Sequence, residues 1–137
     1  MQEIRNMAAA IIIEGNKILL VHNTKHNSLR IEPPGGKKEE FEIFEECAVR
    51  ETMEELGISI KVKNLFGVYG TDSPEGRFEV HMFLSEITGG EISLKEKDKI
   101  SDYSWYSYND LKELASKKIL VPNMCSAMPE LLKLLNG

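Results

Sequence analysis

The chain has 137 residues, a length that predicts one domain spanning residues 1–137. Hydrophobic residues make up 42% and charged residues 28%, a balance that is typical of globular proteins and excludes a disordered chain. The two cysteines, Cys47 and Cys125, are too few for a disulfide framework or a cysteine-rich zinc site, so we expect a cytoplasmic protein. The net charge of −5 argues against nucleic acid as a partner, and the longest apolar run, Met7 to Ile13, is too short to cross a membrane.

The N-terminal part of the chain predicts a β-hairpin and then a helix. Ala8 to Ile13 and Ile18 to His22 are apolar runs, and the residues between them favour a tight turn. The second run is continuously apolar, so we expect its sheet to be covered on both faces. Pro33-Pro34-Gly35-Gly36 excludes a helix or a central strand at that point. From Ile43 to Leu56 the pattern is helical, and Gly57 stands where a left-handed cap belongs.

The rest of the chain predicts further strands and helices. The expected strands and helices, in chain order, are Val62 to Tyr69, Phe78 to Ile87, Tyr103 to Tyr106, Asp110 to Lys117 and Ser126 to Leu135. A loop around Pro74 separates the first two strands, and Asn109 is the expected cap of the first of these helices. Strands and helices mixed in this way predict a layered α/β or α+β domain.

All of the net charge lies between Gly36 and Ile58, which carry eight acidic and three basic side chains. On the predicted helix, Glu51, Glu54 and Glu55 share an arc about 100° wide. A separate apolar arc is suited to packing on a sheet and contains Phe44, Ala48, Val49, Thr52, Met53 and Leu56. Like charges three or four residues apart destabilise a helix by about 0.2–0.5 kcal/mol per pair, and near its C-terminus they oppose the helix dipole. A solvated, glutamate-rich face is the simpler interpretation, whereas a cation-binding site explains the clustering.

Arg50 can reach part of this charge, but one arginine cannot neutralise three carboxylates. A divalent ion can, and oxygen ligands of this kind favour Mg²⁺ or Mn²⁺. Gly35 and Gly36 lack Cβ atoms, so their carbonyl groups can approach a metal or a phosphate closely. Because a bound metal neutralises phosphate oxygens while a carboxylate deprotonates water, the pattern predicts metal-assisted hydrolysis of a phosphate ester or anhydride.

The spacing of these residues resembles a family signature. Gly36, five residues, Glu42, seven residues and then Arg50-Glu51-Thr52-Met53-Glu54-Glu55-Leu56-Gly57-Ile58 is similar to the Nudix box, Gly-x5-Glu-x7-Arg-Glu-U-x-Glu-Glu-x-Gly-U, where U is bulky and aliphatic. Eight of the nine specified positions match, and Thr52 is the exception. The resemblance extends over the whole chain through Pro34-Gly35 and through Trp105, which precedes a helix. It implies a Nudix fold, an α/β/α sandwich with a mixed β-sheet between helices.

The resemblance also implies roles for individual residues. Glu51 resembles the general base or a metal ligand, and Glu54 and Glu55 resemble metal ligands, together with the carbonyl group of Gly35 or Gly36. Arg50 and Glu42 resemble residues that orient these carboxylates, so Glu51, Arg50 and Glu54 form the expected catalytic group. The family often places a further acidic residue shortly before the tryptophan, where this chain has Lys99. We therefore expect Asp98 or Glu96 to supply that carboxylate from a mobile loop, unless Lys99 itself contacts the substrate.

The predicted function is hydrolysis of a nucleoside diphosphate linked to another moiety, with Mg²⁺ or Mn²⁺ as the cofactor. The first choice of substrate is a nucleoside triphosphate, as in MutT-like enzymes, because the chain is short. ADP-ribose or another nucleotide sugar is the alternative, which Pro74 favours weakly through its distance from the box. A binding or sensing module without turnover is the alternative from another class. We expect a small-molecule nucleotide as the partner, no nucleic acid, no membrane, and a monomer or homodimer.

Overall fold

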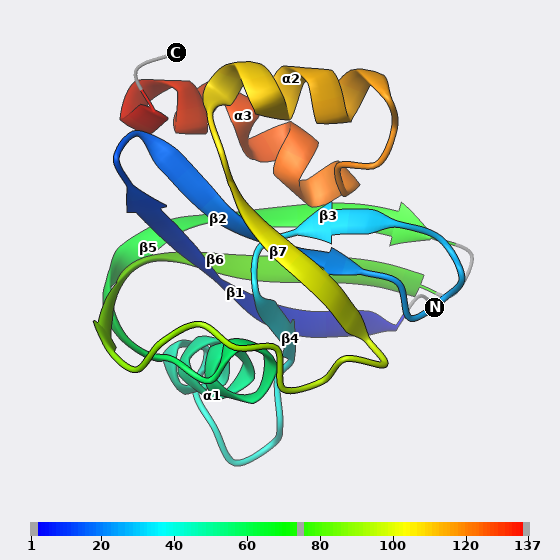
Figure 1. Cartoon of the computed structure of the whole chain (residues 1–137). Coiled ribbons are helices and arrows are strands. Elements are labelled where there is room, and N and C mark those ends of the chain that lie inside the picture. The colour runs from blue at the N-terminus through cyan, green and yellow to red at the C-terminus, as the bar shows by residue number, and fades with distance from the viewer. Residues whose placement is uncertain (1–2, 74–75, 136–137) are drawn as a thin grey trace.

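The computed structural model describes residues 3–73 and 76–135, in which a mixed β-sheet lies between helices (Figure 1). The strands are β1 (Ile4–Glu14), β2 (Lys17–Asn23), β3 (Arg30–Glu32), β4 (Gly35–Lys37), β5 (Ser59–Ser73), β6 (Gly76–Gly89) and β7 (Ile100–Tyr106). The order is β3-β2-β1-β6-β5, with β4 paired to β1, β7 paired to β2, and β1 parallel to β6. Helix α1 (Phe44–Leu56) covers one side, and α2 (Tyr108–Ser116) and α3 (Pro122–Leu135) cover the other. The predicted layered fold is confirmed.

Strand β1 explains why the sheet is apolar on both faces. Ala8, Ala10 and Ile12 belong to the cores beneath α1, whereas Ala9 and Ile11 belong to the core that includes residues of α2 and α3. Successive side chains of a strand point to opposite faces, so a strand covered on both sides needs no polar alternation. The apolar runs of the predicted hairpin therefore correspond to buried strands.

Pro33-Pro34-Gly35-Gly36 contains no helix and no central strand, as the sequence predicts, but its two glycines begin a short strand, β4, which pairs with β1 alone among the described residues. Gly35 and Gly36 begin β4, which pairs antiparallel with Ala9 and Ala8 of β1. A Cβ atom on Gly35 would lie 2.3 Å from the carbonyl oxygen of Ala8. The glycines therefore allow β4 to approach β1 more closely than a residue with a side chain could.

The helix ends show one confirmed cap and one corrected cap. Gly57 follows α1 with φ of 70°, and its N–H donates to the Met53 carbonyl oxygen at 2.9 Å, as the sequence predicts. Helix α2 begins earlier than expected, because Ser107 rather than Asn109 is its cap. Ser107 Oγ accepts from the Asp110 N–H at 3.1 Å, and the Asp110 carboxylate accepts from the Ser107 N–H at 2.9 Å.

Other elements are longer than predicted. Helix α3 starts at Pro122 instead of Ser126, since proline is compatible with a first helical turn. Strands β5, β6 and β7 all extend beyond their expected bounds. Pro74, at which the sequence places a loop, lies outside the described residues. No helix within those described ranges combines the length and apolar character needed to cross a membrane.

Candidate active site

Helix α1 places its glutamates at different depths. Glu55 is completely buried, Glu51 is 9% exposed, and the Glu54 side chain remains 44% exposed. The apolar side of the helix packs on the sheet, and Thr52 fits there because its hydroxyl donates to the Ala48 carbonyl oxygen at 2.7 Å. Met53, which the helical wheel places on the apolar arc, is 43% exposed, because it lies at the edge of that arc.

Arg50 joins three of the glutamates in one network. Its Nε and Nη2 atoms donate to the two carboxylate oxygens of Glu42 at 2.9 and 2.7 Å. Its Nη1 atom donates to Oε1 of Glu51 and to Oε1 of Glu54, both at 3.0 Å. Nη2 also donates to the carbonyl oxygen of Lys37 at 3.1 Å. The fork-like contact with Glu42 needs a planar guanidinium, so Arg50 fixes Glu42 and Glu51 relative to β4.

Gly35 and Gly36 make the close contact between β4 and the buried glutamates possible. A Cβ atom on Gly36 would lie 2.5 Å from Cδ of Glu51, so any side chain there would displace this carboxylate. The N–H of Gly35 donates to Glu55 Oε1 at 3.3 Å. The carbonyl group of Gly36 accepts a weak hydrogen bond from Cys47 Sγ at 3.5 Å. Both glycines are therefore required by packing as well as by the chemistry that the sequence suggests.

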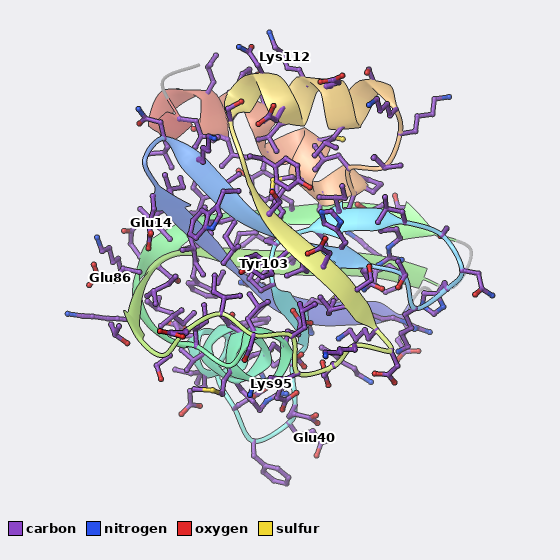
Figure 2. All side chains as sticks on the ribbon, in the orientation of Figure 1. Glu14, Glu40, Glu86, Lys95, Tyr103 and Lys112 are labelled. Carbon is purple, nitrogen blue, oxygen red and sulfur yellow. The ribbon has the colours of Figure 1, made fainter. Side chains whose placement is uncertain are left out.

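Lys99 provides the charge that opposes Glu55. Its Nζ atom lies 3.1 Å from Glu55 Oε2 and 4.0 Å from Glu96 Oε1. The segment that leads to β7 crosses the C-terminal end of α1, where the Lys95 N–H donates to the Glu55 carbonyl oxygen at 3.1 Å (Figure 2). The backbone of this segment thus satisfies a carbonyl group at the helix end and brings Lys99 over the buried carboxylate.

Burial and nearby charges act in opposite directions on these groups. Burial raises the pKa of Glu55 to about 8, while the Lys99 ammonium opposes the increase. Burial also raises the pKa of Glu51, against the charges of Lys99 and Arg50. Hydrogen bonds from Arg50 lower the pKa of Glu42 to about 2. The two buried carboxyl groups therefore need positive charge beside them to remain ionised.

The donor set fits a hard divalent cation in its chemistry, because carboxylate and carbonyl oxygens are the ligands that Mg²⁺ and Mn²⁺ prefer. Glu96 Oε1 is a buried oxygen with no hydrogen-bond partner in the described part of the chain. In the present side-chain conformations, however, the described residues contain no group of three His, Cys, Asp or Glu side chains that could hold a metal. Arg50 and Lys99 contact the relevant carboxylates instead, so an ion would exchange with these contacts.

The structure brings most of the predicted site residues together. These are Gly35, Gly36, Glu42, Arg50, Glu51, Glu54 and Glu55. Asp98 is exposed, and of the two expected carboxylates it is Glu96 that approaches the site through Lys99. Sequence reasoning missed the direct pairing of Lys99 with Glu55. The available signal was a lysine at a position where the resemblance favours an acidic residue.

A cavity of about 380 Å³ borders the same two glycines. Its apolar lining comes from β1, β6, the segment between α2 and α3 and the start of α3, and includes Met7, Phe78, Val80, Met82, Leu120 and Pro122. Arg30, Glu32, Thr71, Lys118 and Asn123 add polar groups to its wall. The cavity has the size and composition of a small-molecule site, and Gly35 and Gly36 connect it to the glutamates.

The sequence profile of the NUDIX domain matches residues 4–124 of the chain, so the chain belongs to the NUDIX family. The resemblance predicted from the box is confirmed, and so is the α/β/α fold that it implies.

Two curated proteins with different names are similar in sequence to the chain. An ADP-ribose pyrophosphatase of Methanocaldococcus jannaschii is 38% identical over 109 residues, which cover 77% of this chain and 63% of that protein. An NAD-capped RNA hydrolase, NudC, of Haemophilus influenzae is 35% identical over 127 residues, which cover 87% of this chain and 46% of that protein. The chain thus spans less than two thirds of the length of either relative. Both relatives have the names of hydrolytic enzymes, and the hydrolase activity expected of this chain stays a prediction.

Solved structures agree on the fold. A MutT Nudix hydrolase from Burkholderia pseudomallei superposes with a TM-score of 0.83 at 23% identity, covering 94% of this chain and 98% of that one. A Nudix hydrolase from Nitrosomonas europaea gives a TM-score of 0.82 at 20% identity, covering 93% and 88%. At such identities the likeness concerns the fold alone.

Proposed function

We propose that the chain is a metal-dependent pyrophosphohydrolase that cleaves the diphosphate bridge of a nucleoside diphosphate linked to another moiety. One observation carries this proposal: Gly35 and Gly36 contact the buried Glu55 and Glu51 and also line the neighbouring cavity. Buried carboxylates are costly unless they are paired or hold a cation. The cavity gives a nucleoside space next to them, so that its phosphates would lie over the glycines.

The proposed roles follow the contacts of each side chain. Glu51, Glu54, Glu55 and a carbonyl group of Gly35 or Gly36 would hold Mg²⁺ or Mn²⁺, which when bound supplies positive charge to the phosphate oxygens. Glu51 is the proposed general base and takes a proton from water on a carboxylate oxygen, a task for which its raised pKa is suitable. Arg50 and Glu42 orient Glu51.

ADP-ribose is the substrate that we favour. The relative with 38% identity is named an ADP-ribose pyrophosphatase, and NAD, like ADP-ribose, has a diphosphate bridge between two ribose units. The adenine ring would pack against Phe78 and Met82, and Asn123 would contact its edge. Asn123 Oδ1 accepts a hydrogen bond from Thr71, which fixes the orientation of the amide.

A nucleoside triphosphate is the second candidate. A MutT Nudix hydrolase shares the fold of this chain over 98% of its own length, which keeps a nucleoside triphosphate as a candidate substrate. A binding module without turnover is disfavoured because Glu42, Glu51, Glu54 and Glu55 are all present. A cytoplasmic location, a monomeric or homodimeric state and the absence of nucleic-acid substrates stay predictions.

A substrate panel with identified products tests this proposal. ADP-ribose, NADH, dGTP and an NAD-capped RNA oligonucleotide are incubated with Mg²⁺ or Mn²⁺. AMP and ribose 5-phosphate from ADP-ribose are the expected products, and Asn123→Ala should raise KM for ADP-ribose more than it lowers kcat. Release of pyrophosphate from dGTP, with ADP-ribose untouched, would favour the second candidate. No turnover of any compound would contradict the hydrolase proposal.

A further inference from the structure

The ion pair between Lys99 and Glu55 is an unusual feature of the site. Glu55 Oε2 is completely buried, and the Lys99 ammonium is 3.1 Å away on a side chain that is 26% exposed. Glu55 Oε1 is held by the Gly35 N–H, so both oxygens of this carboxylate have donors. A group that the proposed function assigns to a metal is therefore fully satisfied by the chain itself.

The backbone holds Lys99 at this place. The Lys99 N–H donates to the Glu96 carbonyl oxygen at 3.0 Å, and the Lys99 carbonyl oxygen accepts from the Thr24 N–H at 2.9 Å. The side chain has four flexible carbons and one compact charge, so its ammonium can leave the carboxylate while its Cα stays fixed. Lys99 is thus positioned to make and release the contact with Glu55.

We propose that Lys99 is a built-in counter-ion of Glu55 that competes with the divalent cation for this carboxylate. The inference rests on the proposed metal site. Without metal, the ammonium compensates the buried negative charge. When a metal ion binds Glu55, Lys99 has to release the Glu55 carboxylate. A lysine ammonium only donates hydrogen bonds, and it would repel a second cation bound to the same carboxylate. Lys99 therefore weakens metal binding in the absence of substrate.

The displaced ammonium links the metal to the substrate. Once released from Glu55, the ammonium can pair with Glu96. Glu96 Oε1 lies 4.0 Å away and has no hydrogen-bond partner in the described residues. A substrate phosphate is a stronger acceptor, because a lysine commonly binds phosphate as a point charge. Nucleotide binding should then favour displacement, so metal and nucleotide bind more tightly together than separately, and each raises the affinity of the other by the same factor.

Direct measurement of Mn²⁺ binding by electron paramagnetic resonance tests the inference without relying on turnover. The variants are Lys99→Met, Lys99→Arg and the matched control Lys97→Met, which removes an exposed lysine from the same segment. Without nucleotide, Lys99→Met should bind Mn²⁺ at least about tenfold more tightly than the wild type, because a repelling charge is lost. Lys97→Met should stay within about twofold, since exposed charges are screened. Lys99→Arg should resemble the wild type.

The same titrations with AMP present test the coupling. AMP should tighten Mn²⁺ binding more in the wild type than in Lys99→Met. Melting in EDTA supplies a second readout: Lys99→Met should melt below the wild type, and saturating Mn²⁺ should close most of the difference. Should Lys99→Met fail to fold in EDTA, Lys99→Arg and Lys99→Gln are titrated in its place, and Lys99→Gln should bind more tightly.

The outcomes separate this inference from the proposed function. Equal Mn²⁺ affinity in the wild type, Lys99→Met and Lys97→Met would overturn the counter-ion role while the metal site stands. Weaker binding in Lys99→Met would overturn it too, since Lys99 would then support the metal. If none of the proteins binds Mn²⁺, with or without AMP, the proposed metal site fails and the inference fails with it.

Discussion

Replacing Arg50 with methionine should destabilise the metal-free chain strongly. The change removes six hydrogen bonds, of which the one to Cys47 Sγ is long at 3.9 Å, and leaves three carboxylates without their cation. The side chains of Glu42 and Glu51 are 13% and 11% exposed, so their ion pairs with Arg50 are neither fully buried nor at the surface. Breaking a buried ion pair costs about 3–5 kcal/mol, whereas a surface pair contributes about 0–1 kcal/mol. We expect a loss of about 2–3 kcal/mol, which corresponds to a fall in Tm of about 6–10 °C for a chain of this length.

Urea unfolding in EDTA measures this loss. Arg77→Met is the matched control, because Arg77 also bridges two carboxylates, Asp72 and Glu79, but at the surface. The double variant Arg50→Met/Glu42→Gln should recover part of the stability, since it removes one of the stranded charges. The reasoning is refuted if Arg50→Met loses no more stability than Arg77→Met, or if the second substitution lowers stability further.

Three further predictions concern the same site. Gly36→Ala should lower kcat by at least about a hundredfold while the chain stays folded, because its Cβ would lie 2.5 Å from Cδ of Glu51; Gly89→Ala, whose Cβ would meet only an atom 3.9 Å away, should keep wild-type rates. The pKa of Glu42 falls from 4.5 to about 2 on folding, so its stabilising effect is complete above pH 4.5 and is lost as the pH falls toward 2. Unfolding curves of Glu42→Gln should lack this part of the acid dependence, and identical slopes in both proteins would contradict it. Mg²⁺ at a hundredfold excess over its Kd should raise stability by about 2.7 kcal/mol, and EDTA should reverse the increase; a Tm that ignores both Mg²⁺ and Mn²⁺ would contradict the metal site.

Local signals explain which parts of the fold were predictable. The helix from Ile43 to Leu56 and its cap at Gly57 depend on a helical period and on one left-handed glycine, and both are visible within a short window. The two strands of the hairpin are also local, since a turn joins them. Strand β4 is different, because it exists only where Gly35 meets the alanines of a distant strand.

The candidate site shows the same division. Glu51, Glu54 and Glu55 share a helix, so their clustering follows from spacing alone. The Lys99 contact joins residues 44 positions apart, and no local pattern reports such a pair. Burial was only partly visible. A helical wheel places Glu55 between Phe44 and Ala48 on the apolar side, but it does not show that β4 also covers Glu51 and leaves Glu54 exposed.

Hydrolysis of ADP-ribose in ¹⁸O-labelled water tests the central claim most directly. With Mg²⁺ and the wild-type chain, mass spectrometry should find AMP and ribose 5-phosphate, with one ¹⁸O atom in only one of the two phosphates. Glu51→Gln should form neither product while it keeps a cooperative unfolding transition, because an amide does not accept the proton of water at neutral pH. Product formation by Glu51→Gln at the wild-type rate would contradict the account, as would a wild-type chain that leaves ADP-ribose, NADH and dGTP intact with both metals.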